Sequence, residues 1–490
     1  MKKVILCFCL CSFSSTDLFS QDWGRFWCFG DSAGINFSNL SAPVADSSWM
    51  DCAESCAAMG DTIHGLLAYA HTDYWPLWIA GSYRTTVIHN KNHQIMIYGD
   101  SLIGNAFHGG LTFINKPNYD SLFYLFQWGF RPDSGLFYSI LNPFYSNNSG
   151  IVFKKNQQLP LGSNNLQMGE LAIKHANGRD WWIIVRNWWQ SNRFNLFLVE
   201  PDTIAGPFEQ DIGSITTTDI AGMAVSKDGS RLALVNYDGL IETYLFDRCS
   251  GQISNPNRIF PVPSIKYFGC EFSPNGNLLY VSNTDNIFGN DSLRIFQFDL
   301  TSPNPAINYQ IIYSKNVPVS GGFLKRGPDD KIYTTGLYEI GWRYPDSARN
   351  QYNENLGVIQ YPDSFGVACA YNPFSFYLGG RRTYWNLPNN PNYLLGPLTG
   401  TICDSLTLGI KEEKSHRNLQ AFPNPASNKV FVLSEENENE VMNFYSMDSK
   451  IIYSGILRKG INSFDVSSFP AGIYVLRVNR YQAIKIIISR

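Results

Sequence analysis

Apolar and polar positions along the middle of the chain form a repeating unit, in which a short apolar run, a polar turn and a second apolar run follow one another. The clearest copies are AGMAVSKDGSRLALVN from Ala221, GCEFSPNGNLLYVSN from Gly269 and GGFLKRGPDDKIYTTG from Gly321. Short runs rich in Val, Leu, Tyr and Phe that are joined by turns with Gly, Asp or Asn are typical of β-hairpins. Because no helical period runs through these segments, the pattern predicts strands.

The hairpin unit recurs at spacings between 45 and 59 residues across residues 21–400. Seven positions are equivalent in the turn of this unit: Asp61, Asn118, Asn177, Asp228, Asn275, Asp329 and Phe374. A four-stranded sheet cannot cover both of its faces alone, whereas a ring of such sheets buries them against one another. The repeat therefore predicts an all-β fold, a β-propeller with seven blades. Since the first and last units are the least regular, six or eight blades stay open.

A different pattern occupies residues 419–490, where short runs rich in Val, Ile, Tyr and Phe alternate with turns. Pro423 and Pro425 remove two backbone donors and push the residues before them towards extended geometry, so a helix cannot begin there. Several short strands without a helical period predict a small immunoglobulin-like β-sandwich.

This last segment closely resembles the C-terminal sorting domain, type A, of Bacteroidota proteins that the type IX secretion system exports. The resemblance rests on motifs in the same order along the segment, and these include Pro423, Asn424, Pro425, Gly472, Tyr474 and Lys485. It implies recognition by the outer-membrane translocon, followed by removal of the domain by a sortase. The mature protein would then be attached to the cell surface or released. An ordinary immunoglobulin-like module is the alternative.

The N-terminal residues 1–20 agree with export. Lys2 and Lys3 precede an apolar run of signal-peptide length, and Leu18-Phe19-Ser20 is an acceptable cleavage site. The run is too short to span a bilayer, so no transmembrane segment is expected in the mature chain. We expect the propeller over residues 21–400 and a linker over residues 401–418.

The predicted propeller also resembles a family of large secreted Bacteroidota proteins that carry this kind of sorting domain. The match begins with the segment WCFGDSAGINF at Trp27 and includes ELAIKH at Glu170, FDRCSG at Phe246 and LGGR at Leu378. The resemblance implies a fold and a location outside the cell, and it implies no reaction.

Composition narrows the classes of partner. The formal net charge is −3 and 16% of the residues are charged, which argues against a nucleic-acid partner, since such a partner requires a basic face. Removal of the signal peptide leaves seven cysteines: Cys28, Cys52, Cys56, Cys249, Cys270, Cys369 and Cys403. Cys52 and Cys56 have no second pair at zinc-finger spacing, so disulfides or buried thiols are favoured over a metal site. We expect neither a metal nor another cofactor, and the cysteine pairing stays open.

Acidic residues and one histidine come just before the strands that should line the propeller channel. The candidates for an acid and a base are Glu54, His108, Glu170 and Asp219. If these residues converge at one mouth of the channel, they could bind a cation or transfer protons. The alternative is that they cap strands or are simply solvated.

Aromatic residues gather in one predicted hairpin around Arg186. Trp188 and Trp189 beside Arg186 are candidates for a ligand surface, because exposed tryptophans next to polar groups suit stacking on sugar rings. The alternative is packing between blades, the usual place of such rings.

Three functions of different class follow from these observations. The first is a binding or adhesion module for glycan or protein at the cell surface or outside the cell, favoured because no common catalytic motif is present. The second is a secreted hydrolase or lyase that acts on a polysaccharide or a lactone-type substrate in the channel. The third is a structural protein of the cell surface.

Overall fold

The structure, a computed structural model, describes residues 21–72, 85–105, 109–129, 135–163, 165–259, 265–284, 292–316, 319–338, 345, 347–404, 420–434, 440–447, 450–478 and 484–489. The chain divides into two compact units, Met1–Leu406 and Thr407–Arg490. The predicted signal peptide and residues 405–418 of the predicted linker lie outside the described residues.

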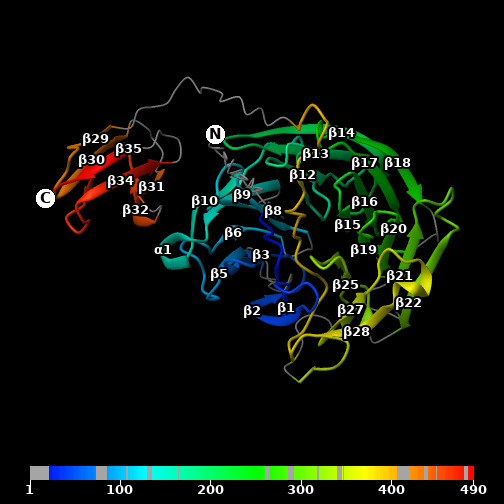
Figure 1. Ribbon diagram of the computed structural model, residues 1–490. Helices are drawn as coiled ribbons and strands as arrows, with labels where there is room; N and C mark the ends of the chain where they lie inside the picture. The colour runs from blue at the N-terminus through cyan, green and yellow to red at the C-terminus, as the bar shows by residue number, and fades with distance from the viewer. Residues whose placement is uncertain are drawn as a thin grey trace, which may run out of the picture. The chain divides into compact units, whose positions relative to one another are not determined.

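Six four-stranded antiparallel sheets follow one another along the first unit and are arranged around a ring (Figure 1). The first three sheets are β3 (Cys56–Asp61), β4 (Gly65–Thr72), β5 (Thr85–Asn90) and β6 (Leu102–Ile103); β7 (Leu111–Asn115), β8 (Phe123–Gly129), β9 (Gly135–Asn142) and β10 (Ile151–Gln158); and β11 (Leu171–Lys174), β12 (Trp181–Arg186), β13 (Ser191–Val199) and β14 (Ile204–Thr216). The next three are β15 (Ala221–Val225), β16 (Arg231–Asn236), β17 (Ile241–Phe246) and β18 (Ile253–Ile259); β19 (Tyr267–Phe272), β20 (Leu278–Asn283), β21 (Ser292–Asp299) and β22 (Tyr309–Asn316); and β24 (Leu324–Arg326), β25 (Ile332–Thr334), β27 (Asn355–Ile359) and β28 (Tyr371–Tyr377). The fold is a β-propeller, as the repeat predicts.

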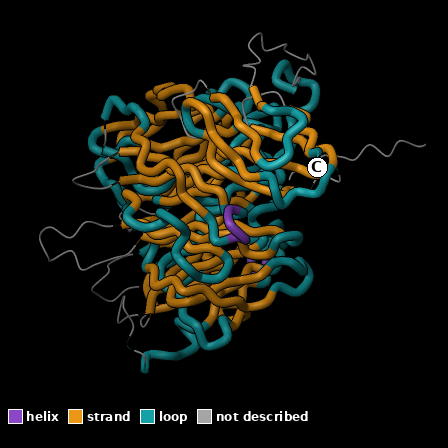
Figure 2. The backbone as a smooth tube through the Cα atoms, turned by 90° about the vertical axis from the view of Figure 1, so that its left-hand side faces the viewer, coloured by secondary structure: helices purple, strands orange, loops and turns teal. Residues whose placement is uncertain are grey.

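Other regular structure in this unit is brief, and strands dominate the tube trace (Figure 2). It consists of the two-stranded sheet of β23 (Val319–Ser320) and β26 (Leu337–Tyr338), the distorted helical turn α1 (Tyr145–Asn148) and the 3-10 turn η1 (Gly366–Cys369). Among the described residues, no helix combines the length and the apolar character that crossing a bilayer requires.

The ring is closed by the hairpin of β1 (Phe26–Asn36) and β2 (Val44–Cys52), which lies between the sixth sheet and the first. The Trp27 ring packs edge-on against Tyr333 of β25 at 5.6 Å, and the same apolar core includes Tyr69 of β4. Asp31 pairs with Arg382 through the backbone and through an ion pair of 2.5 Å. The N-terminal hairpin therefore occupies the seventh position.

This closure corrects one expectation. The predicted seventh turn at Phe374 is wrong, because Phe374 lies inside β28, the outer strand of the sixth sheet. The apolar pattern around Phe374 imitates a hairpin, but the bend that follows the sixth sheet leads the chain towards β1 instead. A Cβ at Gly30 would meet the Arg382 carbonyl oxygen at 2.4 Å, so this close approach requires glycine.

The burial of each strand follows its place in the sheet. All six residues of β20 are buried, because neighbouring sheets cover both of its faces, whereas the outer strand β22 is only half-buried. The turns have the expected polar chemistry: Asp228 accepts hydrogen bonds from the hydroxyls of Ser226 and Ser230, and Gly229 has a φ of 75°. Local sequence and ring packing thus agree.

The central channel is occupied by the chain itself. After β28 the segment of residues 383–398 runs through the middle of the ring (Figure 1). Trp385 N–H donates to the Ala53 carbonyl, just before β3, and Asn389 N–H donates to the Cys56 carbonyl, at the start of β3. Farther along, the Tyr393 ring packs on Trp181 at the far end of the inner strands, 5.8 Å between centroids. We call residues 383–398 the channel segment.

A disulfide holds the chain beyond the channel segment. Cys249, in the turn after β17, is bonded to Cys403, and 154 residues separate them. The other described cysteines, Cys28, Cys52, Cys56, Cys270 and Cys369, are buried free thiols. The first residues of the predicted linker are therefore tied to the propeller.

The second unit is the small sandwich that the sequence predicts. Its two antiparallel sheets are β29 (Gln420–Phe422), β30 (Lys429–Ser434) and β33 (Gly460–Asp465), and β32 (Ile451–Leu457), β31 (Glu440–Ser446), β34 (Gly472–Val478) and β35 (Ile484–Ile488). Alternate residues of these strands, such as Val430, Val432, Phe444 and Leu476, form one apolar core.

Candidate functional site

The predicted acidic residues lie where the inner strands begin. Glu54, Glu170 and Asp219 come just before β3, β11 and β15, at the same end of the channel. His108 lies outside the described residues, although the carbonyl of Gly109, which follows it, accepts a hydrogen bond from Glu170 N–H at 3.1 Å. We call this end the strand-start mouth.

Apolar rings cover the strand-start mouth. Tyr384 and Trp385 of the channel segment form a buried cluster with Phe268, Phe323 and Leu337. The Trp385 ring lies 5.4 Å from Phe268, and only 8% of Trp385 is exposed. The sequence suggested that the predicted acids form an open polar ring at this mouth. In the structure, an apolar cover lies over the mouth instead.

Glu170 is the one predicted acid with a strongly perturbed environment. Only 2% of the residue is exposed, and burial raises the pKa of its carboxyl group to about 8, an effect that the Thr112 hydroxyl partly opposes. Asn389 of the channel segment donates to the Thr112 hydroxyl at 2.7 Å and to the Glu170 carbonyl at 3.0 Å. Burial therefore favours the neutral form of the Glu170 carboxyl group, which the channel segment encloses.

The predicted ligand surface around Arg186 separates into an interior part and an exposed part. Arg186 is fully buried and donates to Gln167 at 3.0 Å, to the Thr216 hydroxyl at 2.7 Å and to the Ser214 carbonyl at 2.6 Å. Trp189 is 58% exposed and its ring packs edge-on against that of Trp188 at 5.4 Å. Arg186 therefore belongs to the inside of its sheet, and the tryptophan pair remains at the surface.

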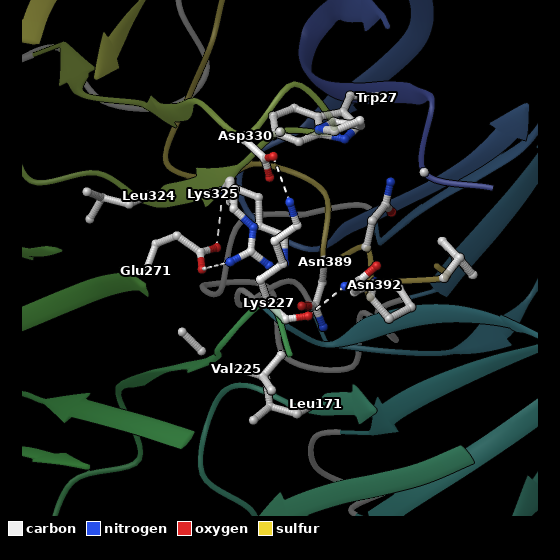
Figure 3. A pocket seen from close by; sticks show the side chains of 18 of the residues that line it. Trp27, Leu171, Val225, Lys227, Glu271, Leu324, Lys325, Asp330, Asn389 and Asn392 are labelled. Atoms are coloured by element: carbon white, nitrogen blue, oxygen red, sulfur yellow. Dashed lines mark hydrogen bonds and ion pairs between the residues drawn. The ribbon is translucent and has the colours of Figure 1, made fainter. Parts of the chain in front are cut away.

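A pocket opens near the turns between first and second strands, where the channel segment leaves the ring, and its lining extends along the inner strands as far as Leu171 and Phe323 (Figure 3). Its cavity volume is about 140 Å³. The walls combine the Trp27 ring, inner-strand residues and the amides of Asn389, Asn390 and Asn392. We call it the mouth pocket.

Charged groups of both signs line the mouth pocket. Lys227 Nζ and Asp330 Oδ2 form an ion pair of 2.7 Å at the rim (Figure 3). Arg326 Nη1 lies 3.9 Å from Glu271 Oε1, and the Arg326 backbone N–H donates to Glu271 Oε2 at 3.0 Å. Lys325 is partly buried beside them, and burial lowers its pKa while Glu271 partly opposes that change.

Sequence reasoning missed this pocket, although a signal for it was present. Ala224, Glu271 and Lys325 occupy the same position of the repeat, each four residues before the turn residue. This position lies on an inner strand. In the unit of Ala224 it is apolar, as an inner position should be, whereas the next two units carry charged residues there. Charges at Glu271 and Lys325 therefore break the pattern in neighbouring sheets and mark a polar wall.

The described residues include no cluster of three or more histidine, cysteine, aspartate or glutamate side chains that could hold a metal ion. Cys52 and Cys56 are buried in the apolar core that joins β1, β2 and the first sheet. Cys52 also donates its S–H to the Ser55 carbonyl oxygen at 3.0 Å. These thiols therefore have a structural environment.

The second unit has a clear relative. Residues 420–489 match the family described as the secretion system C-terminal sorting domain. This unit is a sorting domain of the type IX secretion system, which exports proteins across the outer membrane. No curated protein matches the sequence.

Solved structures similar to the chain share little sequence with it. A candidate 6-phosphogluconolactonase from Bacteroides fragilis has 10% identity and a TM-score of 0.45, over 76% of this chain and 98% of that chain. The Dos1 propeller has 11% identity and a TM-score of 0.41, over 75% and 87% of the two chains. The Cps50 (Swd1) β-propeller domain from Myceliophteria thermophila has 11% identity and a TM-score of 0.34, over 64% and 93%. At these values the likenesses carry no argument about ligand or reaction.

Proposed function

We propose that the protein is an exported binding propeller that works at the cell surface or outside the cell, and that it binds glycan through a single sugar unit held in the mouth pocket. The observation that carries this proposal is the pocket itself, where a cavity of about 140 Å³ meets amide and charged side chains. The sorting domain at residues 420–489 supports a role outside the outer membrane.

The size and lining of the pocket favour one sugar ring. A cavity of about 150 Å³ admits one six-membered ring, and the mouth pocket measures about 140 Å³. Amide side chains both donate and accept hydrogen bonds, which matches hydroxyl groups that do the same. Asn392 and Asp330 at the rim and the Trp27 ring in the wall supply these polar and apolar contacts.

Binding of the complete exported protein to a glycan array tests the proposal. Val225→Phe places a ring in the pocket from a half-buried strand end, so we expect it to abolish glycan binding. Trp189→Ala is the matched control on the other candidate surface, and we expect it to keep binding. Loss with Trp189→Ala and not with Val225→Phe would place the ligand on the Trp188–Trp189 pair and contradict the pocket.

A secreted hydrolase or lyase is the second candidate, and Glu170 is the observation in its favour. A carboxyl group with a pKa of about 8 is protonated at neutral pH and could act as a general acid. The aromatic cover of Trp385 and Phe268 stands against access of a polysaccharide. Turnover of a polysaccharide from a test panel, abolished by Glu170→Gln, would favour this candidate. If the protein neither turns over a polysaccharide nor binds a glycan on the array, a structural surface protein would be favoured.

A further inference from the structure

The mouth pocket holds one cation more than its partners neutralise. Three cationic and three acidic residues line it: Lys227, Lys325, Arg326, Asp22, Glu271 and Asp330. Asp22 is engaged outside the lining, because Arg25 Nε lies 2.5 Å from its carboxylate. Lys227 and Asp330 neutralise each other at the rim. Two cations, Lys325 and Arg326, are left with one carboxylate, that of Glu271.

Glu271 forms its ion pair with Arg326, with 3.9 Å between Oε1 and Nη1, and it also acts on Lys325 as a nearby charge. Its Oε2 accepts the Arg326 backbone N–H at 3.0 Å, and its Oε1 accepts the Phe272 N–H at 3.0 Å. Within the part of the chain that the structure describes, the Lys325 side chain makes neither a hydrogen bond nor an ion pair, while its backbone belongs to the ladder of β24 and β25. An ammonium group that is partly withdrawn from water and shares a single nearby carboxylate with Arg326 is incompletely compensated, so the pocket favours an anion that reaches it.

The walls of the pocket contain two more donors without acceptors among the described residues. They are Asn390 Nδ2 and Arg326 Nη1, and both atoms are enclosed. A buried donor without an acceptor is destabilising, and native structures rarely leave one without a reason. This excess of donors points in the same direction as the unneutralised charge, towards a ligand rich in acceptor oxygens.

We infer that the mouth pocket selects a sugar unit that carries an anionic group, such as the carboxylate of a uronic acid, and that Lys325 supplies the counter-charge. The inference rests on the proposed function of the pocket and names its ligand class. A uronic acid ring fits the same cavity as a neutral hexose, because the two rings differ only in the oxidation state of the exocyclic carbon. Charge, and not size, would therefore decide between them.

Titration calorimetry on the complete exported protein tests this selection with methyl β-glucuronide and methyl β-glucoside as paired probes. We expect the glucuronide to bind about tenfold more tightly, a difference of about 1.4 kcal/mol, since it adds one charge-assisted hydrogen bond. Lys325→Gln should remove that preference, and Lys325→Arg should keep it. Lys154→Gln on β10, away from the pocket, is the matched control and should change nothing.

The remaining outcomes separate the inference from the function on which it rests. Equal binding of glucoside and glucuronide overturns the inference and leaves the sugar pocket standing. Absence of binding by both probes overturns the inference and the sugar pocket together. Inorganic sulfate that binds as tightly as the glucuronide shows a site for ions rather than acidic sugars, which also overturns the inference. Thermal unfolding of Lys325→Gln, expected to match the unchanged protein, excludes misfolding as the cause of any loss.

Discussion

The Tyr393 hydroxyl donates a hydrogen bond of 2.7 Å to the carbonyl oxygen of Phe113, a residue 280 positions earlier in the chain. Tyr393 belongs to the channel segment and Phe113 to β7, an inner strand of the second sheet. This contact fixes the segment at the far end of the channel, beside the mouth pocket that Tyr393 also lines. The segment is therefore part of the propeller core and shapes the candidate site.

Replacement of Tyr393 by phenylalanine should destabilise the propeller by about 1–2 kcal/mol, because the buried Phe113 carbonyl loses its donor while the ring stays in place. Urea denaturation followed by tryptophan fluorescence measures this change. Tyr361→Phe, at a tyrosine that is 64% exposed, is the control and should have little effect. Equal midpoints for the two variants would mean that the channel segment is not anchored there.

Loss of the Cys249–Cys403 disulfide should lower stability by about 5 kcal/mol, since the bond closes a loop with 154 residues of separation and restricts the unfolded chain. Denaturation with and without a reductant measures the effect. The double variant Cys249→Ser/Cys403→Ser should be insensitive to the reductant. A thiol titration of the denatured mature protein should find five free thiols, and a count of seven would contradict the bond.

Glu170 should make stability depend on pH. Burial raises its pKa from 4.5 to about 8, so between these values the folded protein holds a proton that the unfolded chain releases. The contribution is fully present below pH 4.5 and is lost as the pH rises towards 8. Glu170→Gln should remove this pH dependence. Compared with the unchanged protein, the variant should gain more stability at pH 8.5 than at pH 5, and this difference should be on the order of a few kcal/mol. Parallel denaturation curves at the two pH values would disprove the neutral carboxyl group.

Arg186 should act as a structural residue. Arg186→Lys removes the planar fork that reaches Gln167, Thr216 and Ser214, and should lower stability by about 1–3 kcal/mol. Differential scanning calorimetry measures the shift. Trp189→Ala, at an exposed side chain of the same region, should leave the unfolding temperature nearly unchanged. A larger loss for Trp189→Ala would reverse these assignments.

Asn424 should be needed for export, because it ties the start of the sorting domain to its last strand. Its side-chain amide donates to the Lys485 carbonyl at 2.6 Å and accepts from Ile487 N–H at 2.8 Å. Asn424→Ala should destabilise the domain by about 1–2 kcal/mol and reduce the fraction of protein found outside the cells. Ser454→Ala, at an exposed residue of β32, is the control. If the Asn424 variant is exported as well as the unchanged protein, Asn424 is not needed for sorting and the prediction is wrong.

The propeller could be predicted because its signal is local and repeated. Each copy, such as the one at Ala221, encodes its strands and turn within sixteen residues. Phe374 shows where this reasoning fails, because an apolar run with a central Asn-Pro has the same local pattern in an outer strand as in a hairpin. The pairing of Asp31 with Arg382, which decides how the ring closes, has no local signal.

The candidate site was harder to predict, for a related reason. Counting from the turns places Glu54 and Glu170 correctly at the starts of inner strands, and this position is a property of the repeat. Their surroundings depend on Trp385 and Asn389, which reach them from the far end of the propeller sequence. The mouth pocket depends on the same segment, since Asn389, Asn390 and Asn392 form one of its walls.

By itself, the sequence determined the all-β class, the repeated hairpins and the identity of the sorting domain, because periodicity, turn chemistry and motif order are written in neighbouring residues. Only the tertiary structure decided that residues 383–398 fill the channel and that Cys249 pairs with Cys403. It also decided that Lys325 lines a pocket beside Glu271, whose carboxylate already accepts a hydrogen bond from Arg326. These features join residues far apart in the chain. Their energies come from burial and from hydrogen bonds that exist only after the ring has closed.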